Sequence, residues 1–121
     1  MAAAIAWADQ PEREIIPGFH GRLIHSDRMT FLLWRIDAGA PLPEHNHEHE
    51  QVVHMLEGEF ELVLDGVPHR CTAGTVLVIP PNARHSGRAI TDCVVMDVFA
   101  PVREDYRSGE GAATLLGGVR E

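Results

Sequence analysis

The fold is decided by one stretch, Gly39-Ala-Pro-Leu-Pro-Glu-His45-Asn-His47-Glu-His49-Glu-Gln51-Val-Val-His-Met-Leu-Glu-Gly58. Within it, histidines stand at alternate positions directly before an apolar run. Alternate residues of an extended strand face the same side of a sheet. Because His45, His47 and Gln51 share this parity, an extended segment entering a sheet would point two imidazoles and one amide oxygen into one volume. That arrangement is half of a metal site.

The other half of the site is expected from a distant histidine at the end of a second stretch, Gly74-Thr-Val-Leu-Val-Ile-Pro80-Pro-Asn82-Ala-Arg-His85. An apolar strand stops here at a Pro-Pro-Asn turn, and His85 follows just beyond the turn. Imidazoles together with an amide oxygen suit a divalent first-row transition metal. These ligand types do not choose among Mn, Fe, Co, Ni and Zn.

The two stretches resemble the paired motifs of the cupin superfamily. The first motif is Gly, five residues, His, one residue, His, three or four residues, Glu, six residues and Gly, and its register is matched by Gly39, His45, His47 and Gly58. The second motif is Gly, five residues, Pro, one residue, Gly, two residues, His, three residues and Asn, and its register is matched by Gly74, Pro80 and His85. The resemblance implies a cupin fold with one metal site.

Three positions depart from these motifs. Gln51 stands where the acidic ligand usually sits, which leaves the site one negative charge poorer. Many small cupins carry Gln there, so the resemblance implies that Gln51 is a ligand beside His45, His47 and His85. Asn82 replaces the turn glycine, a mild change because Asn tolerates a positive φ better than any residue except Gly. Ala89 replaces the final Asn.

Two alternatives stay open at this site. His49 has the same parity as Gln51 and could compete with it, although the family ligand falls after His49; we expect His49 beside the ligands or exposed. For any single histidine, a solvated strand end is the simpler interpretation. The register of two separate motifs favours the metal site.

Length and charge limit the function. A chain of 121 residues is expected to form one domain. A formal net charge of -8 argues against nucleic acid or an anionic membrane as the main partner, because both need clustered Lys and Arg. The first residues lack a basic region typical of a signal peptide, and the default expectation is the cytoplasm. Cys71 and Cys93 are expected to be buried thiols in that compartment.

Short strands separated by Gly and Pro predict an all-β protein, either a small antiparallel barrel or a sandwich. The cupin resemblance makes this a double-sheet jelly roll, also called a double-stranded β-helix. Expected strands are 19–25, 29–36, 51–56, 60–64, 67–71, 76–79 and 91–99, with a loop over 39–43 and a hairpin turn at Asp65-Gly66. Apolar residues at both parities of 29–36 indicate a strand that is covered on both faces.

The chain divides into three parts on this interpretation. Residues 1–17 form an N-terminal arm, 18–106 the cupin domain and 107–121 a C-terminal tail. The tail could form a short helical turn or remain disordered. Cupin arms often cross to a second subunit, and a short jelly roll leaves sheet edges and apolar outer strands that need cover, so we expect a homodimer.

The last strand and its continuation read Thr91-Asp-Cys-Val-Val-Met-Asp97-Val-Phe99-Ala-Pro-Val-Arg103-Glu-Asp-Tyr106. Asp97 interrupts an apolar strand, and a charge there is costly to bury unless it is paired or functional. Phe99 shares its face, and Arg103 could fold back over the mouth of the barrel. The simpler alternative has Asp97 at the rim and Arg103 on the surface, paired with Glu104 or Asp105.

This ending, together with the histidine stretch, is similar to the small cupins of pectin and alginate degradation. These proteins linearise 4,5-unsaturated monouronates to 4-deoxy-5-keto-uronates. Their metal site lies beside an Asp, a Phe and an Arg that map onto Asp97, Phe99 and Arg103. The resemblance implies a metal-dependent lyase or isomerase that acts on a small sugar acid, with Asp97 as the group that transfers protons.

Two other functions compete with this one. The first is a metal-dependent dioxygenase, which would need Fe and consume O2. The second is a module that binds a sugar acid or a metal without catalysis. Asp97 beside the metal favours the enzyme over the binding module, and O2 uptake separates the two enzymes.

Overall fold

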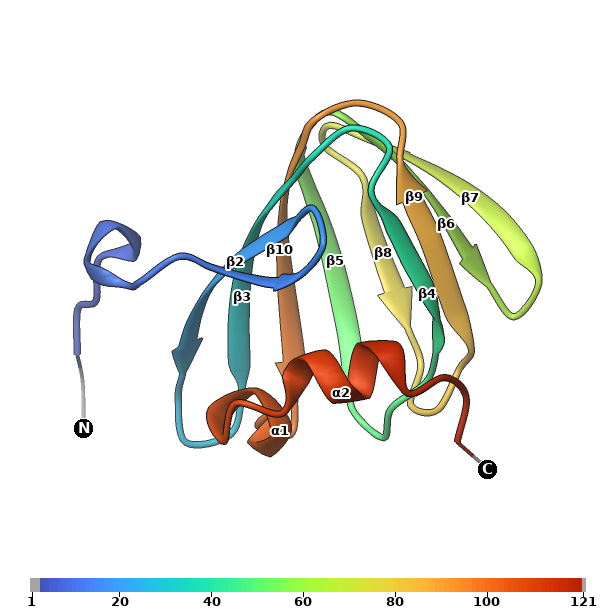
Figure 1. Cartoon of the computed structure of the whole chain (residues 1–121). Coiled ribbons are helices and arrows are strands. Elements are labelled where there is room, and N and C mark those ends of the chain that lie inside the picture. The colour runs from blue at the N-terminus through green and yellow to red at the C-terminus, as the bar shows by residue number, and fades with distance from the viewer. Residues whose placement is uncertain (1–2, 121) are drawn as a thin grey trace.

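Two antiparallel β-sheets lie face to face in the computed structural model, which describes residues 3–120 (Figure 1). The larger sheet has the strand order β1 (Arg13–Ile16), β2 (Phe19–His25), β3 (Thr30–Ile36), β10 (Cys93–Ala100), β5 (Glu50–Glu57) and β8 (Val76–Ile79). The smaller sheet has the order β4 (Pro41–His45), β9 (His85–Ala89), β6 (Glu59–Leu64) and β7 (Val67–Thr72). The predicted all-β jelly roll is confirmed.

The larger sheet turns one face to the core because its strands alternate. In β3 the side chains of Leu32, Trp34 and Ile36 are buried, whereas those of Phe31 and Leu33 are half-buried. The strand predicted to be covered on both faces is therefore fully covered on its inner face and partly covered on its outer face. The inner face is closed by the smaller sheet, and the outer face is only partly covered.

Strand β4 corrects the prediction of a loop over residues 39–43. Pro41 and Pro43 favour a loop because proline donates no backbone hydrogen bond. However, β4 is the edge strand of the smaller sheet and pairs only with β9, and prolines are tolerated at a sheet edge. The other expected strands agree with the structure to within two residues at each end.

Strand β9 was not predicted either, because Ser86, Gly87 and Arg88 interrupt any apolar pattern. Its glycine is required by packing. A Cβ atom on Gly87 would lie 2.4 Å from the Phe60 ring and 2.4 Å from the Glu61 carbonyl oxygen. Glycine lets β9 lie directly against β6, which brings the start of β9 to the edge strand β4.

Two turns form as the sequence predicts. Asp65 and Gly66 both have positive φ, 48° and 82°, and Leu64 pairs with Val67 across the hairpin between β6 and β7. Asn82 has a φ of 66°, which is the backbone conformation that the replaced glycine of the motif would adopt. The turn after β8 therefore keeps its shape without glycine.

The C-terminal residues form two short helices, α1 (Glu104–Arg107) and α2 (Gly111–Leu116). They lie across one end of the two sheets, the lower end in Figure 1. At the other end of the chain, η1 (Trp7–Asp9) precedes β1, which pairs with β2. The first two residues of the expected arm and the last residue of the expected tail lie outside the described residues.

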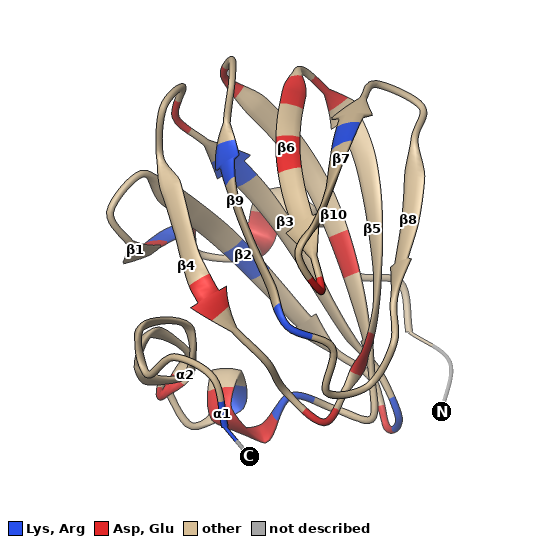
Figure 2. Ribbon diagram, turned by 90° about the vertical axis from the view of Figure 1, so that its right-hand side faces the viewer, with Lys and Arg blue, Asp and Glu red and all other residues tan. Residues whose placement is uncertain are grey.

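Charged side chains are spread over both sheets. Arginines are present on β1, β2, β7 and β9, and acidic residues on β4, β6 and β10 (Figure 2). Cys71 and Cys93 are both buried and free, as expected. No helix within residues 3–120 is long and apolar enough to cross a membrane.

Candidate metal centre and the cavity beside it

Three histidines come together between the two sheets. His45 is the last residue of β4, His85 is the first residue of β9, and the two are paired directly across the strands. His47 lies in the bend that connects β4 to β5. One ring nitrogen from each histidine lies within 4.8 Å of those of the other two. These atoms are close enough to share one metal ion.

The convergence has a different origin from the one expected. The sequence suggested a single extended segment that points His45, His47 and Gln51 to one side. Instead the chain leaves β4 at His45, bends, and enters β5 at Glu50. The residues come together because two strands from opposite sheets meet at this bend.

Backbone carbonyl groups fix which nitrogen of each ring carries the proton. Each histidine approaches a carbonyl oxygen through Nδ1: His45 to Pro43 at 2.9 Å, His85 to Ala83 at 2.9 Å and His47 to His49 at 3.1 Å. A carbonyl oxygen can only accept, so each Nδ1 must donate. The Nε2 atom of each ring is then left with a free lone pair, which is the form that binds a metal.

Burial also keeps these rings neutral. It lowers the pKa of His45 to about 4, and the charge of His85 lowers it further. It lowers the pKa of His47 to about 3, with Arg103 adding to the effect. The pKa of His85 is lowered for the same first reason. A ligating imidazole must be neutral, so the cluster has the protonation state that metal binding needs near pH 7.

Gln51 faces the same volume from the start of β5. Its Oε1 atom lies 3.0 Å from Nε2 of His47. With the proton of His47 on Nδ1, both of these atoms carry lone pairs, and two lone pairs at this distance repel each other unless they share a cation. The chemistry of this donor set therefore fits a divalent metal bound by three imidazoles and one amide oxygen.

His49 lies next to this group but outside it. We expected His49 either beside the ligands or exposed. Its side chain is 8% exposed, so the structure shows the first of these placements. Its ring centroid is 5.5 Å from that of His47, and it does not belong to the cluster of three ring nitrogens. Its backbone carbonyl, rather than its ring, contributes to the site by accepting the hydrogen bond of His47.

Asp97 points into the core from the middle of β10. It is 6% exposed, and Trp34 Nε1 donates a hydrogen bond of 2.9 Å to Oδ2. Burial raises the pKa of this carboxyl group to about 6, although the donors of Trp34 and Gln51 and the charge of Arg103 oppose the change. The alternative of a carboxylate at the rim does not describe this residue. Asp97 can gain or lose a proton close to neutral pH.

Arg103 is completely buried, at 0% exposure. Its guanidinium group lies between two rings, with Cζ 4.7 Å from the centroid of Phe99 and 4.2 Å from that of Tyr106. Nε and Nη2 donate to the two carboxylate oxygens of Asp105 at 2.9 Å and 2.7 Å. The arginine folds back over the mouth of the barrel, and it also has the acidic partner that the simpler alternative expected.

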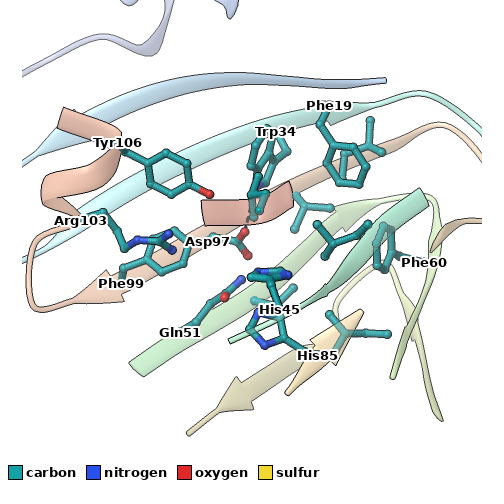
Figure 3. A pocket seen from close by; sticks show the side chains of 16 residues that line it. Phe19, Trp34, His45, Gln51, Phe60, His85, Asp97, Phe99, Arg103 and Tyr106 are labelled. Carbon is teal, nitrogen blue, oxygen red and sulfur yellow. Dashed lines mark hydrogen bonds between the residues drawn. The ribbon is translucent and has the colours of Figure 1, made fainter. Parts of the chain in front are cut away.

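One small cavity of about 40 Å³ lies between these groups (Figure 3), and its polar lining residues are His45, Gln51, His85, Asp97 and Arg103. Among the described residues, three buried polar atoms around it have no hydrogen-bond partner: His85 Nε2, Asp97 Oδ1 and Arg103 Nη1. Each buried polar atom left unpaired costs about 1–3 kcal/mol. A protein that keeps three of them at one place is suited to bind a polar ligand there.

Most of the other lining residues were not identified from the sequence, among them Trp34, Tyr106 and Leu115. Trp34 stands beside β10 through the pairing of β3 with β10, in which it faces Val95. Only the alternation of β3 hinted that Trp34 points inward. Leu115 belongs to the tail, where no strand pattern gave its position.

Comparisons with known proteins agree with this geometry. The family model described as the cupin domain matches residues 32–99. The structure of KdgF from Halomonas sp. has a TM-score of 0.82 and 27% identity, covering 88% of this chain and 99% of that one. An RmlC-like cupin from Shewanella frigidimarina has a TM-score of 0.81 and 28% identity, covering 88% of this chain and 96% of that one.

One curated relative matches over most of its length. The pectin degradation protein KdgF of Dickeya dadantii is 26% identical over 101 residues, which is 81% of this chain and 92% of that protein. The chain spans less than half the length of three other curated relatives. The similarity over the full fold is therefore to small cupins.

Proposed function

The chain belongs to the cupin family, and we propose that it is a metal-dependent enzyme that linearises 4,5-unsaturated monouronates from pectin or alginate breakdown. The observation that carries the proposal is that Asp97, which can exchange a proton near neutral pH, lines one cavity together with Arg103 and with His45 and His85 of the histidine cluster. Similarity to KdgF over 92% of that relative supports the choice of substrate.

We propose that His45, His47, Gln51 and His85 hold one divalent transition metal. Their lone pairs face a common volume, and the backbone already sets the ring orientations. Lewis-acid stabilisation of negative charge on substrate oxygens is the chemistry that such a metal supplies when bound. The identity of the metal does not follow from this donor set.

The reaction sets clear requirements for the protein. The substrate is a cyclic hemiacetal whose ring oxygen is attached to a C4=C5 double bond beside a carboxylate. Opening the ring breaks the bond between C1 and the ring oxygen, converts the C1 hydroxyl to an aldehyde and leaves an enol at C5. A proton must then reach C4 to give the keto acid. The net change moves one proton from the C1 hydroxyl to C4.

The residues around the cavity meet these requirements. Asp97 accepts and returns the proton, and a pKa of about 6 suits both roles near neutral pH. Arg103 has one nitrogen, Nη1, free to bind the carboxylate of the substrate while Asp105 holds the other side of the fork. Phe99 packs edge-on to His47, with ring centroids 5.7 Å apart, and forms part of the cavity wall.

The test is turnover of a purified unsaturated monouronate by the metal-loaded protein. The absorbance of the conjugated double bond should fall faster than in the uncatalysed reaction, and metal analysis should find one ion per chain. Removal of the metal by a chelator should abolish the effect. An oxygen electrode run in parallel should show no O2 uptake. A fully metal-loaded protein that does not accelerate the reaction would refute the proposed substrate.

We also propose a cytoplasmic homodimer. The outer face of the larger sheet exposes Val76 and Val78 on the edge strand β8, at 56% and 52%, and Leu56 on the adjacent β5, at 40%. An apolar face next to a free sheet edge is stabilised by a second subunit. Light scattering should give twice the mass of the chain, and a monomer at micromolar concentration would contradict this.

A further inference from the structure

One side of the cavity beside Asp97 is formed by the C-terminal end of the chain. Helix α2 crosses the end of the two sheets (Figure 1), and its Leu115 lines the cavity together with Asp97 and Arg103. Leu115 is 3% exposed and belongs to the core cluster, although it comes from a segment that pairs with no strand. This leucine therefore occupies space on the side of the cavity where the sheets are open.

The cavity is too small for a sugar acid. Its volume is about 40 Å³, and a cavity needs roughly 10–15 Å³ to hold one water molecule. A few water molecules fill it. A monouronate cannot bind beside the histidines and Asp97 unless some part of the wall moves. The segment that holds Leu115 belongs to neither sheet, so it can move without breaking a strand pairing.

We propose that residues 109–120 form a lid, that Leu115 fills part of the substrate volume when the lid is closed, and that the lid must open to admit the substrate. Glycines with positive φ stand near both ends of this lid, Gly109 at 87° and Gly118 at 77°. Glycine can take up the backbone rotation of a hinge at low cost. Helix α2 has six residues, too few to be stable without its contacts.

Contacts at the start and at the end of the lid also hold it closed. At its start, Gly111 lies so close to Tyr106 that a Cβ atom would be 2.0 Å from the ring. At its end, Arg120 N donates to Asn46 Oδ1 at 2.6 Å, and Asn46 Nδ2 donates to Arg120 O at 2.7 Å. Neither of these hydrogen bonds joins two strands.

The second contact connects the lid to the histidines. Asn46 stands between His45 and His47 in the chain and is 7% exposed. Its side chain forms hydrogen bonds with both the backbone N–H and the backbone carbonyl oxygen of Arg120. The bend that carries two histidines therefore contacts the lid directly, and opening of the lid exposes the side of the cluster that faces the C-terminus.

Quenching of Trp34 fluorescence by acrylamide tests the lid without metal or substrate. Trp34 lines the cavity and is 5% exposed. The chain has two tryptophans, so the experiment uses the full chain with Trp7→Phe. Leu115→Ala should raise the quenching constant several-fold, because loss of a buried leucine shifts the opening equilibrium by about tenfold to a hundredfold. Leu116→Ala, one residue away and 58% exposed, is the matched control.

Equal quenching in the Leu115 and Leu116 variants would overturn the lid. Amide hydrogen exchange of the unmodified protein gives a second test that does not depend on any variant folding. The amides of 114–116 should exchange at least a hundredfold faster than those of the central strand β10, because they open without global unfolding. Equal protection in α2 and β10 would also overturn the proposal.

The lid proposal rests on the proposed function only for the identity of the substrate that the lid admits. If Leu115→Ala raises quenching but no uronate is consumed, the lid stands and the proposed substrate fails. If uronate is consumed while quenching and KM are unchanged in Leu115→Ala, the substrate stands and the lid fails.

Discussion

Replacing Asp97 by Asn should stabilise the protein and inactivate it at the same time. Asn keeps the size of the side chain and can still accept the hydrogen bond from Trp34 Nε1 through its carbonyl oxygen. It carries no charge at any pH, so it removes the cost of holding a carboxylate in the core. It cannot transfer a proton, so it removes the group that we propose for catalysis.

The size of the stabilisation follows from the pKa. Burial raises the pKa of Asp97 from 3.8 to about 6, a difference worth about 3 kcal/mol. A raised pKa means that the folded state binds the proton more tightly than the unfolded state. The stability contributed by this proton is complete below about pH 4 and is lost as the pH rises through about 6. The advantage of the Asn variant should therefore grow between these limits and level off above about pH 7.

The assay is urea unfolding of the metal-free protein at several pH values from 4 to 8. The difference in the free energy of unfolding between Asp97→Asn and the unmodified chain should increase by about 3 kcal/mol over this range. Asp27→Asn, in the exposed turn between β2 and β3, is the control and should show little change. A difference that is independent of pH would refute the reasoning. Turnover should fall by about two to four orders of magnitude.

Three other predictions concern the metal and the substrate. His85→Ala should lose bound metal by elemental analysis, whereas His54→Ala, half-buried on the outer face of β5, should keep it; equal metal content would contradict the ligand set. Burial lowers the pKa of His45 to about 4 and of His47 to about 3. Protons should therefore displace the metal only near these pH values, rather than at about pH 6.5, where a free imidazole titrates. Metal analysis after dialysis at pH 5.5 tests this prediction, and loss of the metal at that pH would refute it. Arg103→Lys should raise KM more than it lowers kcat, because Lys keeps the charge but loses the fork that Asp105 and the substrate share; an unchanged KM would exclude a role in binding.

The histidine cluster could be predicted because the spacing within each of the two motifs is local, and the cupin resemblance brings the two motifs together. His45 and His85 each stand at the end of a strand, and the motif register places those ends at the same edge of one sheet. The bend at His47 could not be predicted from parity, because parity assumes that the chain stays extended. The prolines of β4 also concealed a strand whose edge position only the assembled sheet reveals.

The surroundings of Asp97 depend on contacts that a single sequence does not specify. Its hydrogen bond to Trp34 joins residues that are 63 positions apart. The pairing of β3 with β10 creates that contact, and an alternating pattern indicates a face without naming the neighbouring strand. Leu115 is harder still, because a short helix in a tail gains its position only from what it packs against.

The carbonyl groups of Pro43 and Ala83 make the orientation of two histidine rings independent of the other side chains around the cavity. They orient His45 and His85 through the main chain, each from two residues upstream, and no side chain takes part. The apolar side chains that line the rest of the cavity, such as Leu42, Phe60 and Leu62, are therefore free to vary without turning these rings. Such a frame can be adapted to new substrates by substitution at those positions while the histidine geometry is inherited unchanged.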